Sequence, residues 1–282
     1  MSLVRASLTL FQAVAHHFAM TPPNPTPNKG RYHTEELYIL QIAPLIFWLH
    51  SVALWIFAVF ETLLYLTTVY PAEKMSSYAS LAVCPAASSP STLPHLVPTT
   101  LFYVGCASIF TGALIRLDCF HTLGELFTFD LTVHPAHKLV KTRLYGVVRH
   151  PAYTGSLMLV AGIALAHFTR GGWAAECVFN DQSGWGMIGM YVLWGVWWIW
   201  TSSVGISRAL AEDKQMRFLF GDEWERYARD LRWTAYSLQV IQPSYMTLNF
   251  SNLSDFEGIS YVSEQETYGE DFLAQVLTLS DV

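Results

Sequence analysis

The chain has 282 residues, of which 52% are apolar and 13% are charged, with a formal net charge of −6 at pH 7. Soluble domains carry about 25% charged residues, so this composition excludes an ordinary soluble globular protein and indicates an integral membrane protein. The sequence contains no phosphate-binding glycine loop. It also has no coherent basic stripe, so nucleic acid is not an expected partner.

Five apolar segments predict an all-α, multi-pass transmembrane fold with about five spans. The first runs from Leu3 to Met20, and we expect an uncleaved span because prolines follow without a compact cleavage site. The second is long enough that we predict one tilted helix with Glu61 near its far end. The last four approach the roughly 20 residues that cross a hydrocarbon core: Leu37 to about Leu66, Val97 to Ile115, Pro151 to Phe168, and Trp185 to Ser207.

The distribution of basic residues predicts the orientation of these spans. Thirteen Lys and Arg residues lie in residues 21–36, 116–150 and 208–232, whereas the opposite side has three. Because cytoplasmic loops carry the excess of basic residues, the charged segments that follow the third and the last span should face the cytosol.

We divide the chain into residues 1–36, a span with a cytosolic linker; 37–96, a span with a lumenal loop; 97–243, a core of three spans; and 244–282, an acidic tail. The tail has seven acids and no Lys or Arg, which predicts a disordered segment. Its sequons at Asn249 and Asn252 should stay unmodified in the cytosol. Four cysteines without metal or redox spacing are interpreted as packing residues: Cys84, Cys106, Cys119 and Cys177.

The first charged segment, His137 to Gly155, places polar side chains at the start of an apolar helix. Pro151 disfavours a helical conformation at His150 and itself suits the first helical position. His150 and Tyr153 then flank a helix N-terminus, whose free N–H groups and positive dipole end suit an anion such as a carboxylate. The alternative is that Arg149 and His150 only hold the membrane interface.

The second charged segment, Arg208 to Tyr227, directly follows the last span. Arg208, Glu212 and Met216 share one helix face at i, i+4 and i+8. A Phe-Gly pair should end this helix, and residues 223–231 form an amphipathic stretch that could lie on the membrane. The alternative is a solvated helix cap with surface ion pairs.

Several short motifs follow one another between about Leu114 and Tyr227. They are a Leu-Val pair, a Tyr, an Arg-His-Pro-x-Tyr-x-Gly motif, two spans, a Glu-acid pair and a Phe-Gly-x-x-Trp-x-x-Tyr motif. This order resembles the isoprenylcysteine carboxyl methyltransferases. The resemblance implies a protein-S-isoprenylcysteine O-methyltransferase of the endoplasmic reticulum membrane. It would move a methyl group from S-adenosylmethionine to the terminal carboxylate of a farnesylated or geranylgeranylated cysteine.

The resemblance also implies partners and site residues. A prenylcysteine-terminated protein or peptide and membrane lipid are the implied partners, and no metal is implied. Arg208 is implied to position the substrate carboxylate. Ten residues are implied to contact the cofactor: His137, Lys138, Leu139, Val140, Tyr145, His150, Pro151, Ala152, Tyr153 and Glu212.

The chain departs from the family's pattern at several places. Asp213 stands where a second Glu is usual, Arg143 where a Gly is usual, and Asp230 where an Arg is usual. Residues 169–184 have the character of an insertion. These departures bear on cofactor geometry and substrate preference more than on the reaction class.

The implied reaction suits these residue types. A carboxylate is ionised at cytosolic pH, so its methylation needs alignment and exclusion of water rather than a general base. The prenyl chain should lie among apolar side chains of the spans. A tryptophan cluster in the last span is interpreted as interfacial or packing residues: Trp194, Trp197, Trp198 and Trp200.

Three other functions stay open from the sequence. A phospholipid N-methyltransferase would use the same cofactor, but its amine acceptor must lose a proton to a base such as His150. A membrane sterol reductase would need a nicotinamide cofactor, and a scaffold would have lost catalysis.

Overall fold

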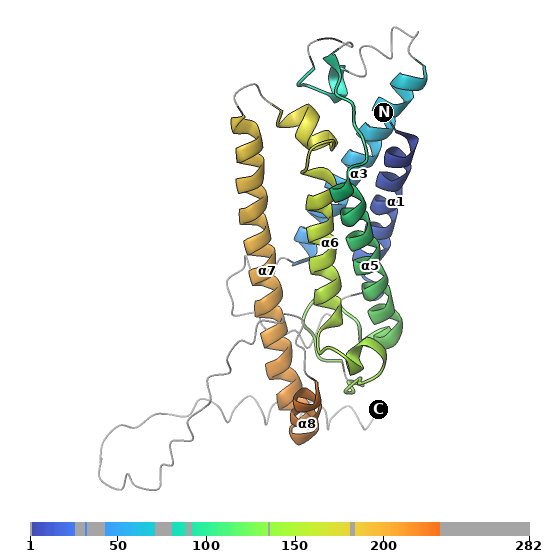
Figure 1. Cartoon of the computed structure of the whole chain (residues 1–282). Coiled ribbons are helices and arrows are strands. Elements are labelled where there is room, and N and C mark those ends of the chain that lie inside the picture. Colours follow the sequence, from blue (N-terminus) through green and yellow to red (C-terminus); the bar gives the residue numbers. More distant parts are fainter. Residues whose placement is uncertain are drawn as a thin grey trace, which may run out of the picture. The chain divides into compact units, whose positions relative to one another are not determined.

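The helices follow the apolar runs of the sequence in a computed structural model that describes residues 2–25, 32, 43–70, 81–87, 89, 92–134, 136–180 and 184–231. Five of them are long (Figure 1): α1 Leu3–Met20, α3 Ala43–Val69, α5 Thr100–Leu123, α6 Pro151–His167 and α7 Trp185–Phe220. Shorter elements are the 3-10 turns Gly124–Leu126 and Arg143–Gly146, the π-helix Ala174–Val178, and helix α8, Asp222–Asp230. The described residues contain no strand, so the predicted all-α class is confirmed.

The lengths of the helices differ in part from the predicted spans. Two stretches, Pro44–Val69 and Thr100–Leu126, are long and apolar enough to cross a membrane, and α6 is a shorter apolar helix. The last predicted span and the charged helix after it form one continuous helix of 36 residues, α7. Residues 37–42, at the predicted start of the second span, lie outside the described residues, as does the acidic tail with both sequons.

Helices α5 and α6 approach each other closely because glycines face glycines along their contact. A Cβ built on Gly112 would lie 2.6 Å from the Gly155 carbonyl oxygen, and one on Gly162 would lie 2.7 Å from the Gly105 carbonyl oxygen. Small residues at such positions let two helix backbones pack with little side chain between them. This contact fixes the start of α6 beside the end of α5, where Arg116 lies.

Helix α1 turns a polar stripe toward the other helices. Arg5, Thr9, Gln12 and His16 recur on one helical face, and all four side chains are fully buried. Arg5 pairs with Glu61 of α3 at 2.9 Å, and the Thr9 hydroxyl donates to the same carboxylate at 2.8 Å. The stripe binds α1 to its neighbours by polar contacts rather than by apolar packing alone.

The helices alternate in direction, so the loops gather at two opposite ends. At one end, the Asn24 amide after α1 donates to the Gly124 carbonyl after α5 at 2.7 Å. At the other end, Arg5 at the start of α1 donates to the Val97 carbonyl just before α5 at 3.2 Å. Both charged segments therefore belong to the Asn24 end of the molecule.

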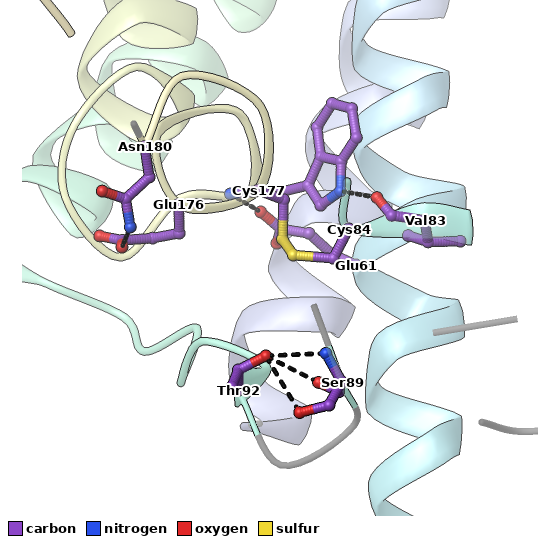
Figure 2. Close-up of a disulfide and its surroundings, with 9 residues drawn as sticks. Glu61, Val83, Cys84, Ser89, Thr92, Glu176, Cys177 and Asn180 are labelled. Atoms are coloured by element: carbon purple, nitrogen blue, oxygen red, sulfur yellow. Dashed lines mark hydrogen bonds between the residues drawn. A yellow bond between two sulfur atoms is a disulfide. The ribbon is translucent and has the colours of Figure 1, made fainter. Parts of the chain in front are cut away.

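A disulfide joins Cys84 and Cys177 (Figure 2). It lies at the Arg5 end, because the backbone N–H of Trp173, four residues before Cys177, donates to Glu61, the partner of Arg5. The prediction that all four cysteines are packing residues is therefore wrong for this pair, whereas Cys106 and Cys119 are free and buried as expected. The pairing partners are 93 residues apart in the chain. Only the packing of the loop after α3 against the turn after α6 brings them together, so no local spacing could have indicated the bond.

Candidate active site

A single cavity at the Asn24 end gathers both charged segments of the chain. It encloses about 180 Å³, and its walls come from α3, α5, the segment 126–149, the start of α6, the end of α7, and α8. His150 and Glu212, which lie 62 residues apart in the sequence, both line it. Of the residues implied by the resemblance, ten line the cavity: His137, Lys138, Leu139, Val140, Tyr145, His150, Ala152, Tyr153, Arg208 and Glu212.

Pro151 is the one implied residue that does not line the cavity. It occupies the first turn of α6 and is buried, with His150 in a non-helical conformation immediately before it. This is the arrangement that the His-Pro pair predicts, because a proline restricts the residue before it and suits the first helical position. Pro151 therefore positions its neighbours rather than contacting the space itself.

His150 is held between two carboxylates of α7. Its Nδ1 lies 3.1 Å from Glu212 Oε2 and its Nε2 lies 2.7 Å from Asp213 Oδ1. Burial opposes the charged form, but the hydrogen bonds and charges of Asp213 and Glu212 outweigh it and raise the pKa of His150 to about 9. At neutral pH His150 is thus an imidazolium that bridges α6 to α7.

The pKa of His150 predicts that folding stability falls as the solution becomes alkaline. A histidine whose folded pKa lies above its unfolded value of 6.5 stabilises the fold fully below pH 6.5 and loses that contribution as the pH rises through about 9. The full contribution is on the order of 3 kcal/mol. Detergent-solubilised protein should therefore lose stability between pH 6.5 and 9.5 relative to His150→Gln. Parallel pH profiles of the two proteins would contradict the imidazolium bridge.

The acid pair after the last span contacts α6 rather than forming a solvated cap. The Tyr153 hydroxyl donates to Glu212 Oε1 at 2.6 Å, and Arg149 Nη1 donates to Asp213 Oδ2 at 2.9 Å. The surface ion-pair alternative is therefore wrong for these residues. Asp213, although shorter than the usual glutamate, reaches both His150 and Arg149.

Arg208 lies one helical turn before Glu212 in the cavity wall. Its side chain is buried, and its Nη2 donates to the Phe129 carbonyl. Burial opposes the charge of this guanidinium, but Tyr153 and the carboxylates of Glu212 and Asp130 outweigh that cost and raise the pKa of Arg208. The guanidinium of Arg208 is thus held in the cavity wall, next to the apolar part of α7.

Arg116 of α5 is a second buried arginine in the cavity wall, and the sequence analysis missed it. Its Nε donates to the Ala19 carbonyl at 2.7 Å and its Nη1 donates to the Ser156 hydroxyl at 2.8 Å, but its buried Nη2 has no hydrogen-bond partner in the described structure. Four aromatic rings surround the guanidinium at 5.0 to 5.9 Å. They belong to Phe47, Phe120, Phe127 and Phe129.

Burying a cation without a carboxylate partner is costly, so the unpaired donor of Arg116 favours an anion in the cavity. None of the hydrogen-bond acceptors described for this guanidinium carries a charge. The sequence signal that could have revealed the site is an arginine at the end of an apolar run, which in a membrane helix often marks function. Tyr32, whose backbone N–H donates to the Leu131 carbonyl at 3.0 Å, is another missed wall residue.

Helix α8, the last part of the second charged segment, forms one wall of the cavity. Trp224 and Tyr227 are buried and line the cavity, and the Tyr227 hydroxyl donates to the Tyr145 carbonyl at 2.8 Å. Burial raises the pKa of Tyr227 to about 12, so the hydroxyl stays protonated and keeps this bond. The aromatic residues of residues 223–231 are therefore turned inward instead of lying on a membrane.

Arg143 adopts a backbone conformation that favours glycine. Its φ is +56°, and it forms an exposed ion pair with Asp118. The resemblance places a glycine at this position, which agrees with the left-handed conformation. The turn before Tyr145 is thus retained with an arginine, at the expense of backbone strain.

Replacing Arg143 by glycine is expected to stabilise the protein. Glycine adopts the left-handed conformation without strain, so the substitution should raise the free energy of unfolding by up to about 1 kcal/mol. The loss of the exposed ion pair and the greater freedom of glycine in the unfolded chain reduce this gain. Thermal unfolding of purified Arg143→Gly and Arg143→Ala would measure this. Both variants lose the ion pair, so Arg143→Ala should be the less stable of the two because it alone keeps the strain. Equal stability of the two variants would mean that the turn is not strained.

Comparison with known proteins matches a part of the chain that contains several of the residues lining the cavity. Residues 100–179 match the family model described as phospholipid methyltransferase. This chain is similar to membrane methyltransferases. Two curated relatives, from Oryza sativa subsp. indica and subsp. japonica, are each called probable protein-S-isoprenylcysteine O-methyltransferase. Each is 33% identical to the chain over 88 residues.

That similarity covers 27% of this chain and 46% of each relative, so the chain spans about half the length of the curated relatives it matches. No solved structure matches the chain. The resemblance seen in the motifs is nonetheless confirmed by the family model and by the names of these relatives. The region that matches the family model contains α5, the segment before α6 and α6 itself, with His150 and Tyr153.

Proposed function

We propose that the chain is an S-adenosylmethionine-dependent methyltransferase that esterifies the C-terminal carboxylate of a prenylated cysteine. The observation that carries the proposal is the shared cavity, in which His150 and Glu212 are hydrogen-bonded while two buried arginines, Arg116 and Arg208, line the wall. Apolar rings complete the wall beside the arginines. Such a space suits an acceptor with an anionic end on a greasy chain.

The residues present fit the chemistry of this transfer. S-adenosylmethionine supplies an electrophilic methyl group, which forms a bond to a carboxylate oxygen as its bond to sulfur breaks. Arg116 offers an unused N–H to the acceptor carboxylate, and Arg208 offers a planar fork at the apolar edge. The aromatic wall excludes water that would mask the carboxylate charge. The protein therefore aligns and desolvates the acceptor rather than moving a proton.

Glu212 is the residue that best suits the donor's hydroxyls or ammonium. Its carboxylate is partly exposed to the cavity, with a side-chain exposure of 30%, while Tyr153 and His150 hold it in place. Removing one charged acceptor should weaken donor binding by roughly tenfold or more. We expect this of Glu212→Gln in equilibrium binding of S-adenosylmethionine, with Glu125→Gln, outside the cavity, as the matched control. A wild-type dissociation constant for Glu212→Gln would remove it from the donor site.

The proposed location is the endoplasmic reticulum membrane, crossed by about five spans, with the cavity on the cytosolic side. Two independent features support this orientation. Of the twelve Lys and Arg residues that the structure describes, ten belong to the segments at the cavity end. The disulfide between Cys84 and Cys177 lies at the opposite end, and disulfides persist in oxidising compartments such as the lumen of the reticulum.

A phospholipid N-methyltransferase is the second candidate, because the matching family model carries that description. An amine acceptor must lose a proton, and His150 is the base that the sequence suggested for this step. Both ring nitrogens of His150 contact carboxylates, and its raised pKa of about 9 leaves it protonated at neutral pH. His150 is therefore poorly suited to accept that proton, which favours the carboxylate acceptor.

One experiment separates the two candidates. Membranes that contain the chain are incubated with radiolabelled S-adenosylmethionine and either N-acetyl-S-farnesylcysteine, phosphatidylethanolamine or no acceptor. The proposed function predicts base-labile label, the mark of a methyl ester, on the prenylcysteine alone. Base-stable label on the phospholipid would instead establish the N-methyltransferase.

A further inference from the structure

The chain after α1 is attached to the cavity wall at two described points. The Asn24 amide donates to the Gly124 carbonyl at 2.7 Å and to the Phe127 carbonyl at 2.9 Å. The backbone N–H of Tyr32 donates to the Leu131 carbonyl at 3.0 Å. All three acceptor carbonyls belong to one stretch of chain that directly follows α5. The main chain of Tyr32 is therefore held against this stretch.

Tyr32 shares the cavity wall with the two residues that the proposed function assigns to the acceptor and the donor. Tyr32, Arg208 and Glu212 all line the cavity. Phe129, two residues before Leu131, accepts a hydrogen bond from Arg208 Nη2 through its backbone carbonyl. The same short stretch thus holds both the main chain of Tyr32 and the guanidinium of Arg208, and the phenol enters the cavity beside them.

The hydroxyl of Tyr32 keeps its proton at every physiological pH. Burial and the negative charge of Glu212 raise the pKa of Tyr32 well above its usual range, and the positive charge of Arg208 opposes this shift only in part. The phenol is thus close enough to both charged groups to interact with them. In this state it donates a hydrogen bond and cannot serve as a base.

Two anions lie near this phenol when both substrates are bound. One is Glu212, whose Oε1 accepts from the Tyr153 hydroxyl at 2.6 Å and whose Oε2 lies 3.1 Å from His150 Nδ1. The other is the acceptor carboxylate, which Arg208 orients under the proposed function. Each oxygen of Glu212 already has a partner, whereas a free carboxylate has about four lone-pair sites to fill. The acceptor carboxylate is therefore the better partner for the Tyr32 hydroxyl.

We infer that Tyr32 is a further acceptor-binding residue, whose hydroxyl donates a hydrogen bond to the carboxylate that Arg208 orients. The inference rests on the proposed function and deepens it, because a residue from the N-terminal part of the chain completes the acceptor site. Tyr32 precedes residues 100–179, which match the family model. The carboxylate carries its full charge before the methyl group moves, so the bond is already made in the bound complex and acts on acceptor affinity.

The test compares Tyr32→Phe with wild type as full-length proteins that methylate N-acetyl-S-farnesylcysteine. Phenylalanine keeps the ring in the wall and removes only the hydroxyl. The KM for the acceptor should rise roughly tenfold or more, because a hydrogen bond to a charged group is lost from a shielded site. The kcat should stay within about twofold, as expected when ground-state binding is removed. The dissociation constant of S-adenosylmethionine should not change, which also shows that the variant is folded.

A competitor without a carboxylate separates this contact from a general change in the wall. N-acetyl-S-farnesylcysteamine has the same prenyl chain and thioether but offers the Tyr32 hydroxyl no anion. Its inhibition constant should therefore be the same for wild type and Tyr32→Phe. Tyr191→Phe is the matched control, because Tyr191 is 52% exposed and lies outside the cavity wall. It should keep the wild-type constants for both compounds.

Three results would overturn the inference while leaving the methyltransferase intact. They are a wild-type acceptor KM for Tyr32→Phe, an equal loss of affinity for the competitor without a carboxylate, and weakened binding of S-adenosylmethionine, which would place the hydroxyl on the donor. Methylation of no prenylcysteine by wild type would instead reject the proposed function, and the inference with it.

Discussion

Replacing Arg208 by alanine is expected to lower carboxyl methylation of a farnesylcysteine at least about 100-fold, the scale seen when a fixed donor that faces developing charge is removed from an active site. The side chain is 6% exposed, lines the cavity and lies one turn from Glu212. Its fork can hold a carboxylate in one orientation, which an alanine cannot. The loss should appear in kcat/KM for the acceptor.

If Arg208 positions the acceptor carboxylate, two further results are expected. Arg208→Lys keeps the charge but not the planar fork, so it should recover only a small part of the activity. Donor binding to Arg208→Ala should stay close to wild type, since Glu212 and Tyr153 keep their own hydrogen bond. The exposed Arg229→Ala, which lies outside the cavity wall, is the matched control. Unchanged turnover of Arg208→Ala would contradict the assignment.

The helices were predictable because long apolar runs leave the backbone few other options in a lipid environment. The convergence of the two charged segments could be expected only from the order of the motifs, since neither segment alone distinguishes a site from a solvated cap. His150 and Glu212 do share one cavity, and their side chains contact each other across the start of α6 and the end of α7. Tertiary packing at the glycine contact of α5 and α6 supplies the alignment that no local pattern contains.

Three features escaped the sequence for physical reasons. The disulfide pairs residues 93 positions apart, so it depends on the packing of two loops. Arg116 was counted with the basic residues of a loop, although it lies within the last turns of α5 and points into the aromatic wall. The polar stripe of α1 is readable in the i, i+4, i+7, i+11 spacing of Arg5, Thr9, Gln12 and His16, but its partners are not.

Glu61→Gln is expected to destabilise the protein by about 3 to 5 kcal/mol, because it leaves a buried arginine without its counter-charge. Both side chains of the Arg5–Glu61 pair are fully buried, and their atoms lie 2.9 Å apart. The same carboxylate accepts the Thr9 hydroxyl at 2.8 Å and the Trp173 backbone N–H at 3.3 Å. A glutamine keeps the shape but cannot neutralise the guanidinium. Unfolding of the purified protein in detergent would measure the loss.

A double substitution separates the charge from the packing. If the cost of Glu61→Gln is that of an orphaned cation, Arg5→Met combined with Glu61→Met should recover most of the stability, since apolar residues of similar volume can replace a buried ion pair. Glu223→Gln, which breaks the exposed pair with Lys141, should leave stability nearly unchanged. A double variant as unstable as the sum of its single variants would show that the pair is not coupled. The polar stripe would then not be what holds α1 against α3.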